Sequence, residues 1–171
     1  MPMNTRIGTF TAAALAAAIL SAPVAFAANP RADVFMQKAI AGNLAEIQVG
    51  RLAQRQGATE GVRHFGAVLV HDHTEANRQA MSAASSMGVT APPSPSAKEQ
   101  AEYQKLASLS GSRFDQAFVK AMVKDHLKDI AQYKREAKTG NGPAASYAQQ
   151  SLPTLHEHLE LAESLERHPR G

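Results

Sequence analysis

Apolar residues recur every three or four positions along almost the whole chain, and this spacing constrains the fold more than any other feature. A period of 3.6 residues places such side chains on one face of an α-helix. The sequence is rich in Ala, Leu, Gln, Glu and Lys, which favour helices, and it lacks the alternating β-branched runs typical of strands. We therefore expect an all-α protein.

Four long helices and one short helix are predicted from this pattern. Glycines and prolines interrupt the periodic segments and mark their ends. The long helices are expected at about residues 32–56, 59–87, 112–138 and from the turn at 140–143 to about 166, with the short helix at about 97–109. The short turns within the first pair and within the second pair predict two antiparallel hairpins.

A proline-rich stretch at residues 91–96 separates the two predicted hairpins. Consecutive prolines favour an extended path, and residues 89–110 could travel the full length of a ~40 Å helix. Two hairpins joined by one long crossover form the connectivity of ferritin-like bundles. We predict a ferritin-like four-helix bundle with a long crossover containing a short extra helix. A simple up-and-down bundle with a decorated loop is the alternative.

The first 27 residues have the layout of a secretory signal peptide. Arg6 precedes an apolar run from Ile7 to Leu20, and the small-residue motif Ala25-Phe26-Ala27 follows. The run is shorter than the ~20 residues of a membrane span, so a retained anchor is the weaker interpretation. We expect cleavage after Ala27, a bundle domain at residues 28–166, a flexible tail at 167–171, and a periplasmic or secreted protein without stable membrane insertion.

Charge and residue types argue against several classes of function. The formal net charge is only +3, basic residues alternate with acids, and there is no Trp, so we expect no nucleic-acid binding. The absence of cysteine excludes disulfides, thiolate metal ligands and thiol nucleophiles. No hydrolase triad motif, phosphate-binding loop or helical His-Glu-x-x-His zinc motif is present. The sequence identifies no partner, and it leaves a homo-oligomer open.

A short pattern that occurs twice supplies the candidate site. The two copies are Phe65, Leu69, Val70, Asp72, His73 and Phe118, Met122, Val123, Asp125, His126. In each copy the His follows the Phe by eight residues, which places it on the buried stripe of its helix with the Asp at the edge of that stripe. His158 on the last long helix and Glu46 on the first also face inward by their spacing.

These inward residues are expected at similar depths in the bundle, where they could meet in one layer. Imidazole and carboxylate groups suit one zinc or iron ion. The predicted metal-site residues are Glu46, Asp72, His73, Asp125, His126 and His158, with the two Asp as ligands or as hydrogen-bond acceptors from the imidazoles. The alternative is a metal-free polar core of Asp–His and Glu–His hydrogen bonds. By the same spacing, His64, His71 and His156 are expected at the surface.

Over roughly Asp33 to Leu165 the chain resembles the exported bacterial family called domain of unknown function 4142. The resemblance rests on Phe35 with Ala39, Gly42-Asn43-Leu44-Ala45-Glu46, Val70-His71-Asp72-His73-Thr74, His126, and Leu152-Pro153-Thr154-Leu155-His156-Glu157-His158-Leu159. It implies a ferritin-like fold and a location in the cell envelope, and it supplies no activity.

The chain departs from the Glu-x-x-His pairs of di-iron ferritin-like proteins, because Val70, Val123 and Leu155 stand three residues before the three histidines. A single ion or no ion therefore fits better than a di-iron centre. We expect an exported binding or stress-related bundle that holds one transition-metal ion. A metal-free interaction module is the alternative, and the sequence leaves enzymatic activity open.

Overall fold

Five α-helices account for nearly all of residues 29–168, the part of the chain that the computed structural model describes. They are α1 (Pro30–Gln56), α2 (Glu60–Ser86), α3 (Ala97–Ala107), α4 (Gly111–Thr139) and α5 (Gly142–Arg167). No strand occurs within these described residues. The all-α prediction is confirmed, and the predicted helix limits agree with the observed ones to within a few residues. The predicted signal peptide lies outside the described residues.

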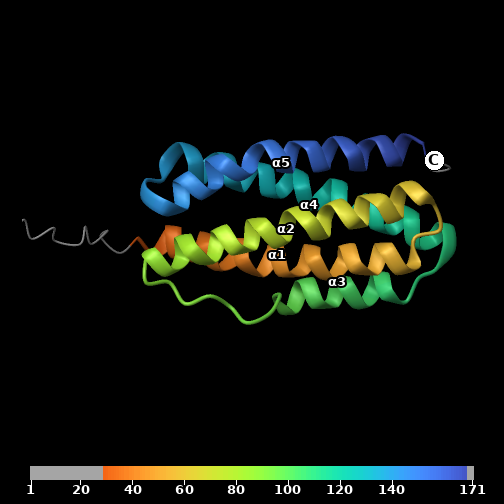
Figure 1. The fold of residues 1–171 in the computed structure, drawn as a ribbon, viewed down its shortest axis with the longest axis horizontal. Coiled ribbons are helices and arrows are strands. Elements are labelled where there is room, and N and C mark those ends of the chain that lie inside the picture. Colours follow the sequence, from red (N-terminus) through yellow and green to blue (C-terminus); the bar gives the residue numbers. More distant parts are fainter. Residues whose placement is uncertain (1–28, 169–171) are drawn as a thin grey trace, which may run out of the picture.

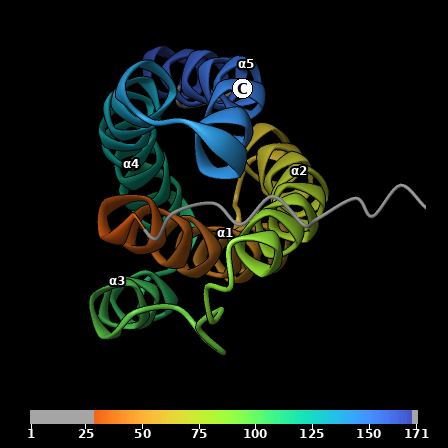
Figure 2. The ribbon, with the colours of Figure 1, turned by 90° about the vertical axis from the view of Figure 1, so that its left-hand side faces the viewer.

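The four long helices form a ferritin-like bundle, as predicted. In Figure 1, α1 and α2 run in opposite directions, as do α4 and α5, whereas α2 and α4 run in the same direction. The chain between α2 and α4 makes this possible because it returns along the whole bundle and includes α3. Figure 2 shows the four long helices around a common axis, with α3 outside them against α1 and α4.

Helix starts follow from local capping. The Asn29 side chain accepts a hydrogen bond from the Arg31 backbone N–H at the start of α1. At the start of α2, the Thr59 hydroxyl accepts a hydrogen bond from the Val62 backbone N–H. A reciprocal capping box joins Ser96 and Glu99 at the start of α3. Such caps satisfy backbone donors that have no partner inside the helix, so the extra helix in the crossover has a well-defined beginning.

The apolar core consists of two clusters, one toward each end of the bundle. Every long helix carries buried polar residues between the two clusters. They are Asn43 and Glu46 on α1, His73 on α2, His126 on α4 and His158 on α5, and we call this set the polar layer. Burial of five polar side chains in one layer is costly unless hydrogen bonds or an ion satisfy them, so the polar layer is the candidate functional site.

The middle of α1 differs in detail from the expectation. Leu44 and Ile47 are predicted to face inward, but they are only half-buried, whereas Asn43 and Glu46 are buried. At this depth the neighbouring helices present His73, which is hydrogen-bonded to Asn43, together with His126 and His158. A polar side chain on α1 can form hydrogen bonds there that Leu or Ile could not.

Helices α1 and α2 approach closely at two glycines, Gly50 and Gly66. A Cβ atom added to Gly66 would lie 2.6 Å from the Gly50 carbonyl oxygen, and one added to Gly50 would lie 2.7 Å from the Gly66 carbonyl oxygen. Only glycine permits backbones to come this close. The contact fixes α2 against α1 and so helps to set the position of His73 along the bundle. Within residues 29–168, no helix is long and apolar enough to cross a membrane.

Candidate metal centre

Three buried histidines from three helices meet in the polar layer. His73, His126 and His158 are each less than a tenth exposed. One ring nitrogen of each lies within 4.8 Å of a ring nitrogen of each of the others. The centroids of their rings are 5.2 to 6.1 Å apart. The predicted convergence of these side chains is confirmed, and we call the three residues the histidine triad.

The first histidine is oriented by its own helix. His126 Nδ1 lies 2.9 Å from the carbonyl oxygen of Met122 on α4. A carbonyl oxygen can only accept, so Nδ1 carries the hydrogen and Nε2 keeps a lone pair in the neutral ring. That Nε2 atom lies 3.2 Å from His158 Nδ1.

The second histidine is oriented by a carboxylate. His158 Nε2 lies 2.8 Å from Asp72 Oδ2 on α2. Partial burial opposes ionisation of Asp72, but hydrogen bonds from His71 and His158 outweigh it and lower the pKa of this carboxyl. The ionised carboxylate accepts a hydrogen from Nε2, which leaves the lone pair of the neutral His158 ring on Nδ1.

The third histidine is oriented by an amide. His73 Nδ1 lies 3.0 Å from Asn43 Oδ1, while the amide nitrogen of Asn43 donates to the Tyr147 hydroxyl at 2.9 Å. The Asn43 oxygen therefore accepts from His73 Nδ1, and the lone pair of His73 is on Nε2. That buried atom has no hydrogen-bond partner among the described residues.

Burial keeps two of these rings neutral. It lowers the pKa of His126 to about 4, with the nearby His158 as the next cause. Burial, followed by the charges on His158 and His126, lowers the pKa of His73 well below its usual value. At neutral pH both rings therefore keep a lone pair. The site presents ring nitrogens whose partners on the far side already fix their tautomers, the arrangement by which proteins prepare imidazole ligands.

The other two predicted ligands lie to one side of the triad. Glu46 and Asp125 are not in the group of converging ligand atoms; they line a cavity between α1, α3 and α4. Glu46 Oε2 is buried without a hydrogen-bond partner among residues 29–168. Burial, followed by the charges of Asp125 and Asp129, raises the pKa of Glu46 well above its usual value. The structure therefore brings together four of the six predicted residues, three as converging imidazoles and Asp72 as an acceptor behind one of them.

The remaining helical histidines stay outside the triad, as expected. His64 and His71 are exposed, and His156 is half-buried. His71 contributes indirectly, because its Nδ1 lies 2.8 Å from Asp72 Oδ1 and so holds the same carboxylate that orients His158.

Sequence reasoning missed the acceptors of two histidines. Neither the Asn43 amide nor the Met122 carbonyl was assigned a role, although each holds one ring. Asn43 could have been found, because it follows inward-facing Ile40 by three residues and therefore shares its face. The Met122 carbonyl leaves no mark in the sequence, since every helical residue has one.

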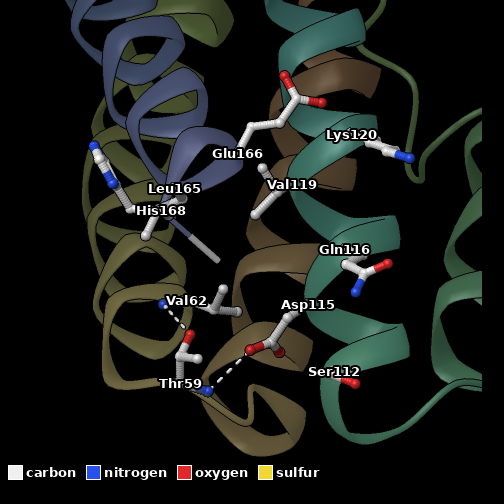
Figure 3. Close-up of a pocket in the computed structure, with 10 residues that line it drawn as sticks. All are labelled: Thr59, Val62, Ser112, Asp115, Gln116, Val119, Lys120, Leu165, Glu166 and His168. Atoms are coloured by element: carbon white, nitrogen blue, oxygen red, sulfur yellow. Dashed lines mark hydrogen bonds between the residues drawn. The ribbon is translucent and has the colours of Figure 1, made fainter. Parts of the chain in front are cut away.

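A separate cavity of about 220 Å³ lies near the end of the bundle where α2 begins. Figure 3 shows buried Asp115 there, pointing toward the turn between α1 and α2. Its two carboxylate oxygens accept hydrogen bonds from the backbone N–H groups of Ala58 and Thr59, each at 2.9 Å. Asp115 therefore ties the start of α4 to this turn, which is a structural role.

Comparisons with known proteins agree with the resemblance seen in the sequence. Residues 19–165 match the family described as Domain of unknown function (DUF4142). A similar solved structure is the crystal structure of a DUF305 fragment from Deinococcus radiodurans, with a TM-score of 0.72 and 15% identity over 82% of this chain and 98% of that chain. At this identity the similarity shows the fold alone. No curated protein matches the chain.

Proposed function

The chain belongs to the family described as Domain of unknown function (DUF4142), whose description assigns no activity, so we propose a function from the site itself. The protein binds one divalent transition-metal ion, zinc or iron, through His73, His126 and His158. Imidazole is a ligand suited to both metals. Binding of a single ion deep in the bundle is the function that the polar layer supports best.

The observation that carries this proposal is the direction of the lone pairs. Hydrogen bonds to Met122, Asp72 and Asn43 each occupy one nitrogen of a triad ring, which leaves His126 Nε2, His158 Nδ1 and His73 Nε2 as the acceptors. Two of these atoms are only 3.2 Å apart, and the third has no partner among the described residues. Three lone pairs repel one another unless a cation lies between them, and one metal ion satisfies all three.

The distances suit such an ion. Zinc–nitrogen bonds of about 2.1 Å in a tetrahedron separate the nitrogens by roughly 3.4 Å. His126 Nε2 and His158 Nδ1 are 3.2 Å apart, and one nitrogen of each of the three rings lies within 4.8 Å of one nitrogen of each other ring, so small side-chain movements reach that value. Three protein ligands leave a fourth position for water or a small ligand, and Asp72 acts from behind His158 to strengthen its ring as a ligand.

A metal-free polar core accounts for less of the geometry. A proton on His158 Nδ1 would turn its contact with His126 into a hydrogen bond and would pair the resulting imidazolium with Asp72. This arrangement leaves His73 Nε2 buried without a partner, at a cost of about 1–3 kcal/mol. The unpartnered nitrogen of His73 is therefore the observation that favours an ion over a proton.

We also propose that the protein is exported to the periplasm or secreted. The layout of residues 1–27 supports this proposal. An envelope protein with this site would bind metal ions outside the cytoplasm.

Calorimetric titration tests metal binding. Chelator-treated protein without a histidine tag is titrated with Zn²⁺, and separately with Fe²⁺ under anaerobic conditions. One equivalent should bind, and His126→Ala should abolish this binding because it removes one of the three ligands. The matched control is His64→Ala, which removes an exposed histidine and should bind as the wild type does. Binding that survives in His126→Ala, or no binding by the wild type, would contradict the proposal.

A further inference from the structure

The larger of two cavities beside the histidine triad has an acidic lining. It has a volume of about 360 Å³ and lies between α1, α3 and α4, and we call it the acidic cavity. Five carboxylates and three lysines line it: Glu46, Glu99, Glu102, Asp125 and Asp129, with Lys38, Lys98 and Lys128. The excess of negative charge in a walled space raises the local concentration of cations.

The acidic cavity spans the distance from the surface to the triad. Its lining includes the exposed Lys98 and Lys128 at one extreme and the buried Glu46 and His73 at the other. Glu46 and His73 are 8% and 6% exposed, and each has a buried polar atom without a hydrogen-bond partner among the described residues. Two unpartnered groups in one cavity, a carboxylate oxygen and an imidazole nitrogen, are both metal-ligand atoms.

The carboxylates of this cavity are close enough to affect one another. After burial itself, the charges of Asp125, Asp129 and Glu99 raise the pKa of Glu46. The charge of Asp125 likewise contributes to the raised pKa of Asp129. Like charges held this close are relieved when a cation enters.

A second cavity reaches the triad from the opposite side but offers a weaker attraction. It has a volume of about 180 Å³ and lies between α2 and α5, with Asp72 and Glu75 among its lining residues. Asp72 already accepts hydrogen bonds from His71 and His158, and Glu75 forms an ion pair with Arg78 at 2.6 Å. The carboxylates on this side therefore have partners. In the acidic cavity Asp129 pairs with Lys128 and Glu99 accepts from the Ser96 backbone N–H, but the buried Oε2 of Glu46 has no partner among the described residues.

We propose that the acidic cavity is the route by which a divalent cation reaches the histidine triad, with α3 as the outer wall and Glu46 as the last carboxylate that the ion meets before His73. This inference rests on the proposed function, because it concerns how the same site is filled. The half-buried carboxylates Glu99, Glu102, Asp125 and Asp129 draw the ion in. The unpartnered oxygen of Glu46 then replaces part of its hydration before the imidazoles bind it.

The rate of metal binding tests the route separately from binding itself. Chelator-treated full-length protein is mixed with Co²⁺ in a stopped-flow instrument, and the visible absorption of the imidazole-bound ion is followed at low and high salt. Asp125→Asn/Asp129→Asn should slow association about tenfold at low salt, with a much smaller effect in high salt, because salt screens the attraction. One equivalent should still bind at equilibrium.

Two further variants keep the test decisive. Glu99→Gln/Glu102→Gln changes the α3 wall and should slow association in the same way even if the first variant folds poorly. Glu157→Gln/Glu160→Gln removes two exposed charges from α5 and should leave the rate unchanged.

If all three double variants bound Co²⁺ as fast as the wild type, the proposed route would be wrong, although the metal site would remain. A Glu75→Gln variant tests the second cavity. Slower binding in this variant alone would also overturn the route, because it would indicate access between α2 and α5. Failure of the wild type to bind Co²⁺ at all would instead overturn the proposed function, and the route with it.

Discussion

Each histidine of the triad is held by a different kind of acceptor. A backbone carbonyl holds His126, a carboxylate holds His158, and a side-chain amide holds His73. The carboxylate is the strongest of these acceptors because it bears a charge. The acceptors can therefore be changed one at a time while all three ligands remain.

Asp72→Asn should weaken metal binding without abolishing it. The amide oxygen can still accept from His158 Nε2, but the negative charge that makes the ring a better ligand is lost. Changes of this kind typically reduce metal affinity 10–100-fold. Competition with a chelator of known affinity measures the change. An affinity equal to that of the wild type would show that Asp72 has no part in the site.

Glu46→Gln should change how stability depends on pH. The pKa of Glu46 is raised above its usual 4.5, so the folded protein keeps a proton there that the unfolded chain releases. The stability that this proton confers is complete below pH 4.5 and is lost as the pH rises through the folded-state pKa. Gln never ionises, so the variant should gain stability relative to the wild type between pH 4 and pH 8.

Urea unfolding of the chelator-treated proteins measures this difference. Glu157→Gln, an exposed site on α5, serves as the control and should show no such gain. If the free energies of unfolding of Glu46→Gln and the wild type differed by the same amount at pH 4 and at pH 8, the raised pKa of Glu46 would be contradicted.

Within single elements, the sequence predicted the inward positions of the three histidines correctly, but it did not predict which residues in the middle of α1 face inward. The repeated Phe, apolar and His spacing places His73 and His126 correctly because helical periodicity alone decides it. On α1 the apolar Leu44 and Ile47 compete with Asn43 and Glu46 for the inward face, and the choice depends on what the other helices present there. Asp125 shows the same limit, since periodicity cannot tell the triad side of α4 from the side facing α3.

Gly66→Ala should destabilise the protein although alanine favours helices. The new Cβ would lie 2.6 Å from the Gly50 carbonyl oxygen and 2.8 Å from the Ala53 side chain, so α1 and α2 must separate. We expect a loss of about 1–3 kcal/mol in the free energy of unfolding.

The matched control for this change is Gly42→Ala, a glycine inside α1 whose added Cβ would have ample room. Its Cβ would meet only Glu99 Oε1, at 4.0 Å, so it should stabilise by up to about 1 kcal/mol through helix propensity. Urea unfolding compares the two variants, and a Gly66→Ala protein as stable as Gly42→Ala would contradict the close contact.

At the scale of the whole molecule, the connectivity could be predicted because it depends on chain length. The stretch between α2 and α4 is long enough to return along the bundle, and the observed parallel α2 and α4 follow from it. Its role as a wall of the acidic cavity could not be predicted, because that depends on which bundle face α3 covers. The family match assigns no activity, so function depends on the site alone.

Export belongs to this scale as well. If residues 1–27 are a cleaved signal peptide, protein recovered from the periplasm or the medium should begin Ala28-Asn29-Pro30 when its N-terminus is sequenced. A protein that still begins at Met1 and needs detergent for extraction would indicate a retained anchor.

The metal content of the native protein decides whether the histidine triad is a metal site. Protein without a histidine tag is purified from the cell envelope and analysed for its elements, beside His126→Ala prepared in the same way. We expect about one equivalent of zinc or iron per chain in the wild type, none in the variant, and a melting temperature that chelator lowers only in the wild type. Wild-type protein without metal, whose melting curve is the same with and without chelator, would contradict this expectation.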